Sequence, residues 1–466
     1  MPLARRSSIL ASMGPIHGFQ GQQLTPRDGG YDEARTVYNA MIDRRPALIA
    51  RCEGPEDVAR AIAYARRRGL PLAVKGGGHS VSGACLNDGG VVIDVGPMRE
   101  ITVDPRLRTA RAGAGLRWGE FDVATQEHGL ATTGGRVSTT GVAGLTLGGG
   151  SGWLERSYGL ACDNLIAVEL VTADGELVRA SAVENPDLFW ALHGGGGNFG
   201  VATAFEFRLH PVGPEVYGGL AVYDPADARE LTRAIRDFHD GGPTRAGMAF
   251  GHAPAREEYD FLPAEWRDRL TFLLVGMWNG PAPEGELMLR PLIEAAEPIA
   301  DLFGTYPYTE FQRMIDDPPG FRNWWTAEYV NELTDEAVEA LCAYGERIPA
   351  GYSQSFVIPW GGAVAAGGDG ATPLANRDAA YVVHPFCLWK EPARDGEHVA
   401  WGRRVRQAMG RWSTGATYLN FIGNEGEDRV RAAFGASYER LVEVKTAWDP
   451  GNVFRGNQNI RPAGAA

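Results

Sequence analysis

One short segment combines a permissive backbone with a side chain that can act as a nucleophile. Residues 75–80, KGGGHS, place three consecutive glycines before His79, directly after the apolar run 72–74. Consecutive glycines let backbone N–H groups approach phosphate oxygens without a Cβ in the way. Neutral imidazole is a nucleophile near pH 7, since the unperturbed pKa of histidine is about 6.5. The segment could therefore hold a phosphate-containing cofactor and trap an electrophilic carbon of that cofactor.

The other glycine clusters support a large ligand. The chain has 62 glycines, with clusters at 76–78, 134–135, 148–150 and 194–197. None of these clusters matches a P-loop or a Rossmann glycine motif, and a single glycine cluster is more often a turn than a ligand loop. Four clusters before residue 200 favour one ligand that lies along several loops, and they mark this region as a nucleotide-binding domain.

The elements that must position these loops change in type along the chain. Helix 54–69 and strand 71–75 lead into the first glycine loop. After residue 214 the glycine clusters stop, and strand-like segments alternate with amphipathic helices. The expected strands are 216–223, 270–278, 324–332, 353–360 and 381–389, and the expected helices lie near 225–239, 284–296, 334–348 and 397–412. This pattern predicts an antiparallel sheet with helices on one face, whose open face could roof a ligand site.

Composition excludes several classes of function. The chain of 466 residues carries 45 Lys and Arg against 58 Asp and Glu, and its net charge of -13 disfavours nucleic acid and anionic membranes as partners. The five cysteines are widely spread without CxxC spacing, which predicts a reduced, cytoplasmic protein without a metal site. Residues 4–10 faintly resemble a twin-arginine export signal, but the apolar stretch is broken at once, so we interpret them as a ragged terminus.

The ordered motifs identify a family. Segment 44–210 resembles the FAD-binding domain of the vanillyl-alcohol oxidase and para-cresol methylhydroxylase (PCMH) superfamily, and more narrowly the bacterial berberine-bridge-enzyme-like (BBE-like) oxidases. The stretches that carry the resemblance are RRPALIARC (44–52), VKGGGHSVSG (74–83), NDGGVVID (87–94), GVAGLTLGGGSGWLERSYGLACDNL (141–165), NPDLFWALHGGGGNFGV (185–201) and DPGNVFRGNQNI (449–460).

The resemblance implies an α+β fold in three parts. Residues 1–214 would form a PCMH-type FAD-binding domain. Residues 215–412 would form a substrate-binding domain of antiparallel sheet with helices on one face. Residues 413–466 would be a BBE-type segment that returns to the FAD domain.

The resemblance also implies the cofactor and its ligands. His79 would correspond to the histidine bonded to the 8α-methyl carbon of FAD. Relatives with a second link carry a cysteine where Val137 stands here, and Cys162 belongs to a separate motif, so we expect one covalent bond. The remaining cofactor-binding residues would be Lys75, Gly76, Gly77, Gly78, Ser80, Thr139, Thr140, Gly141, Gly144, Leu145, Gly149, Gly150, Val201, Asn457 and Asn459.

Catalytic roles are expected for three further residues. Tyr418 and Asn420 match the family's Y-x-N element, and strand alternation would point both toward the flavin, with Leu419 and Phe421 facing the core. Tyr418 would be the proton acceptor if its pKa were lowered; the alternative is a packed strand tyrosine. The resemblance also implies that Thr140 matches the family position that helps decide whether O2 reaches the flavin.

The leading hypothesis is an oxidase that takes hydride from a C–H next to O or N and releases H2O2. A monooxygenase-like biosynthetic enzyme and a non-catalytic flavin-binding protein are the alternatives. The partners would be O2 and a small molecule such as a sugar, amine, alkaloid or polyketide, and the protein would be a monomer or homodimer. His384, Trp360 and Gln354 lie on expected roof strands, where they could line the pocket or pack in the sheet.

Overall fold

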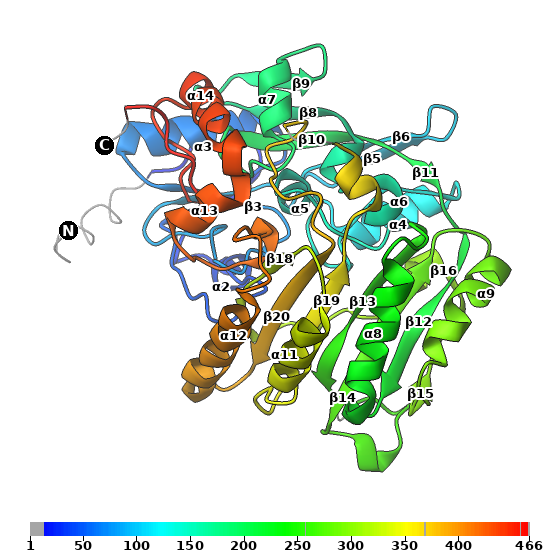
Figure 1. The fold of residues 1–466 in the computed structure, drawn as a ribbon. Helices are drawn as coiled ribbons and strands as arrows, with labels where there is room; N and C mark the ends of the chain where they lie inside the picture. The colour runs from blue at the N-terminus through cyan, green and yellow to red at the C-terminus, as the bar shows by residue number, and fades with distance from the viewer. Residues whose placement is uncertain (1–13, 257, 368–369, 457, 465–466) are drawn as a thin grey trace.

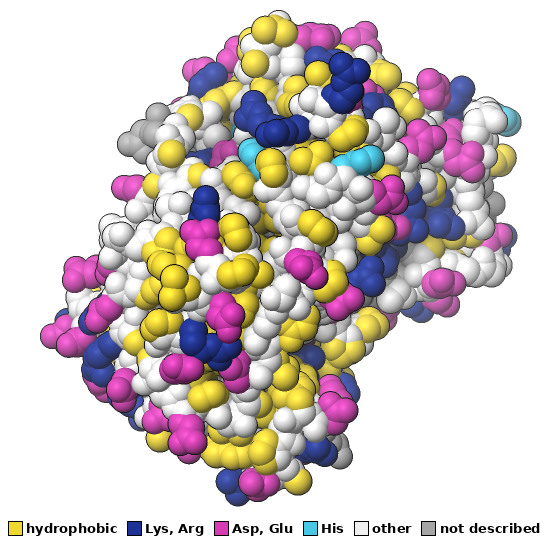
Figure 2. All heavy atoms as spheres, turned by 90° about the vertical axis from the view of Figure 1, so that its right-hand side faces the viewer, with side chains coloured by type: hydrophobic (Ala, Val, Ile, Leu, Met, Phe, Trp, Pro, Cys, Tyr) yellow, Lys and Arg dark blue, Asp and Glu magenta, His cyan; other side chains and the backbone are white. Residues whose placement is uncertain are grey.

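The computed structural model describes residues 14–256, 258–367, 370–456 and 458–464. The export-signal segment 4–10 and Asn457 therefore lie outside the described residues. None of the described helices is both long and apolar enough to cross a bilayer. On the face shown in Figure 2, acidic and basic side chains are interspersed over the surface.

A small sheet leads into the first glycine loop. Strands β2 (Leu48–Arg51), β4 (Val91–Asp94) and β3 (Leu72–Lys75) run parallel, and β1 (Gln22–Leu24) pairs with β2 antiparallel. Helix α3 (Pro55–Arg68) makes the crossover from β2 to β3; it begins with proline at its first position and ends at Gly69 in the left-handed conformation. The buried, β-branched strands fix where β3 ends and the loop that carries His79 begins.

A second sheet accompanies two of the three remaining glycine segments. Its order is β5 (Ile101–Asp104), β6 (Thr109–Gly113), β10 (Val201–Arg208), β8 (Leu165–Val171) and β9 (Leu177–Ser181), and all pairs are antiparallel. Two short helices accompany this sheet, α5 (Val142–Leu147) and α7 (Pro186–Ala191). The glycine segments 148–150 and 194–197 directly follow these helices, so the sheet and the helices hold both loops in place.

The described residues after 214 form one nine-stranded antiparallel sheet. Its long strands are β12 (Glu215–Tyr223), β13 (Ala246–Pro254), β14 (Leu270–Trp278), β19 (Gln354–Pro359) and β20 (Tyr381–Trp389), with the shorter β15 (Ala300–Asp301), β16 (Gly304–Pro307), β17 (Arg322–Trp325) and β18 (Glu328–Val330). Four helices cover one face, as Figure 1 shows: α8 (Ala228–His239), α9 (Ala282–Ile293), α11 (Asp335–Gly345) and α12 (Asp395–Met409). The predicted fold class is confirmed.

Two details of this sheet differ from the sequence expectation. Strand β13 was not anticipated, because its sequence AGMAFGHAP has little β-branched character and two glycines. The expected strand 324–332 is instead two short strands, β17 and β18, that pair with different parts of β20.

Alternation along β20 separates the two faces of the sheet. Tyr381, Val383, Cys387 and Trp389 pack into the core beneath the helices. His384 and Phe386 point to the opposite face, where they line a cavity. The sequence pattern therefore gives this strand one structural face and one face free for function.

The C-terminal segment, with α13 (Glu427–Phe434) and α14 (Tyr438–Trp448), packs back against the glycine-loop half of the molecule, where α14 contacts α7 (Figure 1). Lys445 is fully buried; its Nζ donates to Asp449 at 2.6 Å and to the carbonyl oxygens of Asn198 and Phe454 at 2.7 and 2.9 Å. Asn198 also accepts from the Ile460 N–H at 3.1 Å. These contacts fasten the tail directly to the loop after Gly197.

Candidate functional site

A cavity of about 470 Å³ lies between the glycine loops and the open face of the large sheet. We call its two walls the floor and the roof. The floor comprises the cavity-lining residues of segments 72–85, 135–151 and 194–202. The roof comprises the cavity-lining residues of the large sheet: Leu220, Ala249, Leu273, Val275, Trp325, Gln354, Phe356, Ile358, His384 and Phe386. Cavities of this size commonly bind small molecules and cofactors.

The floor is built by two glycine segments in direct backbone contact. A Cβ added to Gly77 would lie 2.4 Å from the backbone nitrogen of Gly141, and a Cβ added to Gly141 would lie 2.5 Å from the backbone nitrogen of Gly77. Gly78 has a φ of 72°, which side-chain-bearing residues rarely adopt. Backbone N–H groups with no side chains between them fit the diphosphate of a dinucleotide cofactor.

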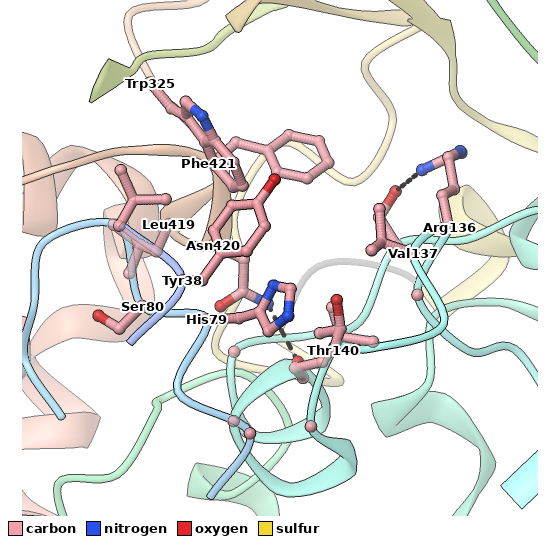
Figure 3. Close-up of a pocket in the computed structure, with 18 of the residues that line it drawn as sticks. Tyr38, His79, Ser80, Arg136, Val137, Thr140, Trp325, Leu419, Asn420 and Phe421 are labelled. Carbon is pink, nitrogen blue, oxygen red and sulfur yellow. Dashed lines mark hydrogen bonds between the residues drawn. The ribbon is translucent and has the colours of Figure 1, made fainter. Parts of the chain in front are cut away.

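His79 is held at the edge of this floor as a neutral imidazole. Its Nε2 atom lies 3.0 Å from Thr139 Oγ1, and its ring stacks on Tyr38 with centroids 4.3 Å apart (Figure 3). Burial, with a further contribution from the Arg117 charge, lowers the pKa of His79 to about 4. In the tautomer in which Nε2–H donates to Thr139, the lone pair of Nδ1 is free to react.

Segment 418–421 differs from the sequence expectation. Leu419–Phe421 is a short 3₁₀ helix, so the predicted strand alternation is wrong. Leu419 and Phe421 pack with the core as expected, but both also line the cavity. The reason is local: the Phe421 N–H donates to the Tyr418 carbonyl at 3.0 Å, and this bond closes a turn that a strand cannot make. Asn420 lines the cavity as expected.

Tyr418 faces away from the cavity. Its side chain is fully buried, and its hydroxyl oxygen accepts the N–H groups of Gly150 and Ser151 at 2.6 and 3.0 Å. The Asn420 amide donates to the same oxygen and to the Leu145 carbonyl, both at 3.0 Å. Burial raises the pKa of Tyr418, and these hydrogen bonds only partly offset the effect. This geometry favours a structural role for Tyr418, which holds the 148–151 turn, over the role of a proton acceptor.

His384 faces the cavity from the roof. Its Nδ1 lies 2.9 Å from the Thr326 carbonyl oxygen, so this nitrogen carries the proton. Burial lowers the pKa of His384 to about 4 and keeps the ring neutral. Of the other two roof candidates, Gln354 lines the cavity, whereas Trp360 is buried beside Tyr418 with ring centroids 5.6 Å apart.

Family models match two segments of the chain. An FAD binding domain matches residues 46–181, and a berberine and berberine-like domain matches residues 417–461. The FAD-linked oxidoreductase YgaK of Bacillus subtilis is 30% identical over 452 residues, which cover 95% of this chain and 97% of YgaK. The chain belongs to the BBE-like FAD-linked oxidoreductases.

Two further similar proteins are both named as 6-hydroxynicotine oxidases. The (R)-6-hydroxynicotine oxidase of Paenarthrobacter nicotinovorans is 29% identical over 461 residues, covering 96% of this chain and 98% of that protein. The crystal structure of 6-hydroxy-D-nicotine oxidase from Arthrobacter nicotinovorans has a TM-score of 0.85 at 27% identity, and covers 96% of this chain and 98% of that one. The family predicted from the motifs is confirmed, and with it an FAD-dependent enzyme.

The structure brings most of the expected residues of this BBE-like oxidoreductase to the cavity. The expected residues that line it are Gly76, Gly77, Gly78, His79, Ser80, Val137, Thr140, Gly141, Gly144, Leu145 and Asn420. Among the described residues, those expected but outside the lining are Lys75, Thr139, Gly149, Gly150, Val201, Asn459 and Tyr418. Lys75 points away, since its Nζ donates to the Ala34 carbonyl at 2.6 Å. Thr139 forms a hydrogen bond with the cavity residue His79, and the Gly150 N–H donates to the Tyr418 hydroxyl.

Several cavity residues were not anticipated. Tyr38 comes from a segment before the matched motifs, and Arg136 is held by Ser151 and Glu155 at 2.7 and 2.6 Å. Asp316, which follows the large-sheet strands β12–β16, accepts the Ser138 N–H at 2.7 Å. This hydrogen bond joins the region after residue 214 to the loop that carries Thr139 and Thr140. No sequence motif signalled either Tyr38 or Asp316.

Proposed function

We propose that this BBE-like oxidoreductase is an oxidase that carries FAD on His79 and transfers electrons from a small molecule to O2. The observation that carries the proposal is the neutral His79, whose Nδ1 is free at the end of a glycine floor that accepts no side chains. FAD supplies a two-electron acceptor at this site. A C–H next to O or N would lose hydride, the adjacent O–H or N–H would lose a proton, and O2 would take up two electrons and two protons as H2O2.

The attachment rests on His79 alone. Val137 lines the cavity but has no nucleophilic atom, and Cys162 is fully buried outside the cavity lining. Burial raises the pKa of Cys162 well above its ordinary value, which keeps the thiol protonated and unreactive. Thr139 orients the imidazole, and Asn420 lines the cavity beside it.

Acid precipitation tests the attachment. The wild-type pellet should stay yellow, whereas His79→Ala should release its flavin into the supernatant. His210→Ala is the matched control, because His210 is also a neutral histidine but lies outside the cavity lining, stacked on Tyr158. A yellow His79→Ala pellet would exclude this attachment site.

Oxygen chemistry separates the oxidase from the monooxygenase-like alternative. Thr140 lines the cavity and offers a side chain small enough to leave room beside it, which supports access for O2. Anaerobic flavin bleaching with a panel of sugars, amines and polyketide phenols identifies a donor, and admission of O2 should then yield stoichiometric H2O2. Incorporation of ¹⁸O from ¹⁸O2 without peroxide would instead indicate oxygenation. A flavin that no donor bleaches, and that stays reduced in air after dithionite treatment, would support a non-catalytic flavin protein.

A further inference from the structure

The roof is strongly apolar and aromatic. Eight of its ten residues as defined above are hydrophobic, and among them Trp325 and Phe386 lie with ring centroids 4.4 Å apart. Tyr259, Phe261 and Phe421 add aromatic side chains at its borders. Tyr38 bridges the two walls, since its ring contacts both His79 and Trp325. A planar ring system could lie against these faces and edges, because aromatic pairs favour stacked and edge-to-face contacts.

Most polar groups around the cavity are already engaged. Arg256 forms an ion pair with Asp317, Asp316 accepts from Ser138, and the Trp325 N–H donates to Asn323 at 3.1 Å. Within the roof, Gln354 and His384 are the two polar side chains that offer further hydrogen bonds. A sugar would leave most of its hydroxyl groups without partners here, and each such buried group is costly.

His384 presents one acceptor of defined orientation. The Nδ1–H donates to the Thr326 carbonyl, so Nε2 carries a lone pair, and no described residue forms a hydrogen bond with that atom. The ring cannot turn freely, because it stacks on Phe421 at 4.4 Å with an interplanar angle of 9° and meets Trp325 edge-on at 5.7 Å. The surrounding aromatic rings favour an aromatic molecule, and the Nε2 acceptor favours one that carries a hydrogen-bond donor.

We infer that the roof selects a planar aromatic substrate that carries a hydroxyl or N–H donor, and that His384 Nε2 accepts the hydrogen bond of this donor. This inference rests on the proposed function, because it names the substrate class of the same cavity. His384 would thereby orient the substrate through this donor, a role distinct from the proton acceptor that the sequence predicted at Tyr418.

Equilibrium dialysis of the holoprotein at pH 7 tests the inference with 2-naphthol and naphthalene, which share a ring system and differ in one hydroxyl. Wild type should bind 2-naphthol about three- to tenfold more tightly, the usual effect of one hydrogen bond. His384→Phe keeps an aromatic ring against Phe421 but removes the acceptor, so it should bind both probes equally. His384→Gln can donate to Thr326 and still accept, and should restore the preference.

His210→Phe is the matched control outside the cavity lining and should leave the preference unchanged. Naphthalene affinity reports whether each variant keeps a folded cavity. An unchanged preference in His384→Phe, or displacement of 2-naphthol by 10 mM cellobiose, would overturn the inference. Because dialysis requires no turnover, its outcome is independent of whether H2O2 is formed.

Discussion

The floor and the roof of the cavity use opposite parts of the polypeptide. The floor is organised around a backbone contact: Gly77 and Gly141 meet so closely that a Cβ on either would collide with main-chain atoms. The roof is side chains: alternate residues of β19 and β20 project into the cavity, and their neighbours pack beneath the helices. A backbone contact of this kind tolerates no side chain at either glycine, whereas the roof can change its lining while the opposite face of each strand keeps the sheet folded.

The largest effect is expected at the backbone contact of the floor. Gly77→Ala places a methyl group 2.4 Å from the Gly141 nitrogen, so the two glycine segments must separate. We expect the purified variant to be colourless, because the separated loops no longer form the diphosphate site. The flavin absorbance per protein measures this loss. Gly396→Ala is the control, since no atom lies within 4 Å of its added Cβ; equal flavin content in the two variants would contradict the contact.

The next largest effect concerns the fastening of the tail to the floor. Lys445→Met removes the buried cation that joins Asp449, Asn198 and Phe454, and leaves Asp449 buried without its partner. Loss of one partner of a buried ion pair costs about 3–5 kcal/mol of unfolding free energy. Chemical denaturation should show this loss, while Lys390→Met, at an exposed lysine whose ammonium lies over the Phe321 and Tyr352 rings, should cost about 1 kcal/mol or less. Equal stability of the two variants would show that the tail is held by other contacts.

A smaller effect is expected at Tyr418, where the sequence and the structure assign different roles. Tyr418→Phe leaves the Gly150 and Ser151 N–H groups without their acceptor, which should cost about 1–3 kcal/mol. A positioning role predicts lower stability and less flavin incorporated per protein, with the rate of flavin reduction by a bound donor nearly kept. The sequence expectation predicts the reverse, with a slow reduction at full flavin content. Tyr438→Phe, at another buried tyrosine, controls for the substitution itself.

The floor could be predicted from the sequence because glycine and histidine themselves indicate a cofactor loop, whatever the surrounding register. Glycines in consecutive positions next to His79 are informative wherever they occur, and the family motifs cover the same residues. The turn at 418–421 was missed because the hydrogen bond from Phe421 to Tyr418 depends on the tail docking against the floor, and local β propensity does not report that docking. Tyr38 and Asp316 were missed because they reach the cavity only through long-range packing.

The roof was predictable as a sheet with one open face, but the identity of the cavity-facing residues depends on register. In β20, a shift of one residue would exchange His384 and Phe386 for Val383 and Pro385. Pairing with β19, where Phe356 lies opposite His384, sets the register that the sequence left open.

The smallest effect is expected where β20 presents one face to the cavity and the other to the helices. Phe386→Leu removes an aromatic face beside Trp325 and should raise the KM of an aromatic donor about three- to tenfold, with flavin content and stability nearly unchanged. Val383→Ala changes a nearby residue on the helix-covered face. This substitution should lower the denaturation midpoint and leave KM unchanged. Steady-state kinetics and denaturation of both variants measure the two responses. If Phe386→Leu and Val383→Ala changed KM alike, the two faces of the strand would not be functionally separate, and the roof could not vary independently of the fold.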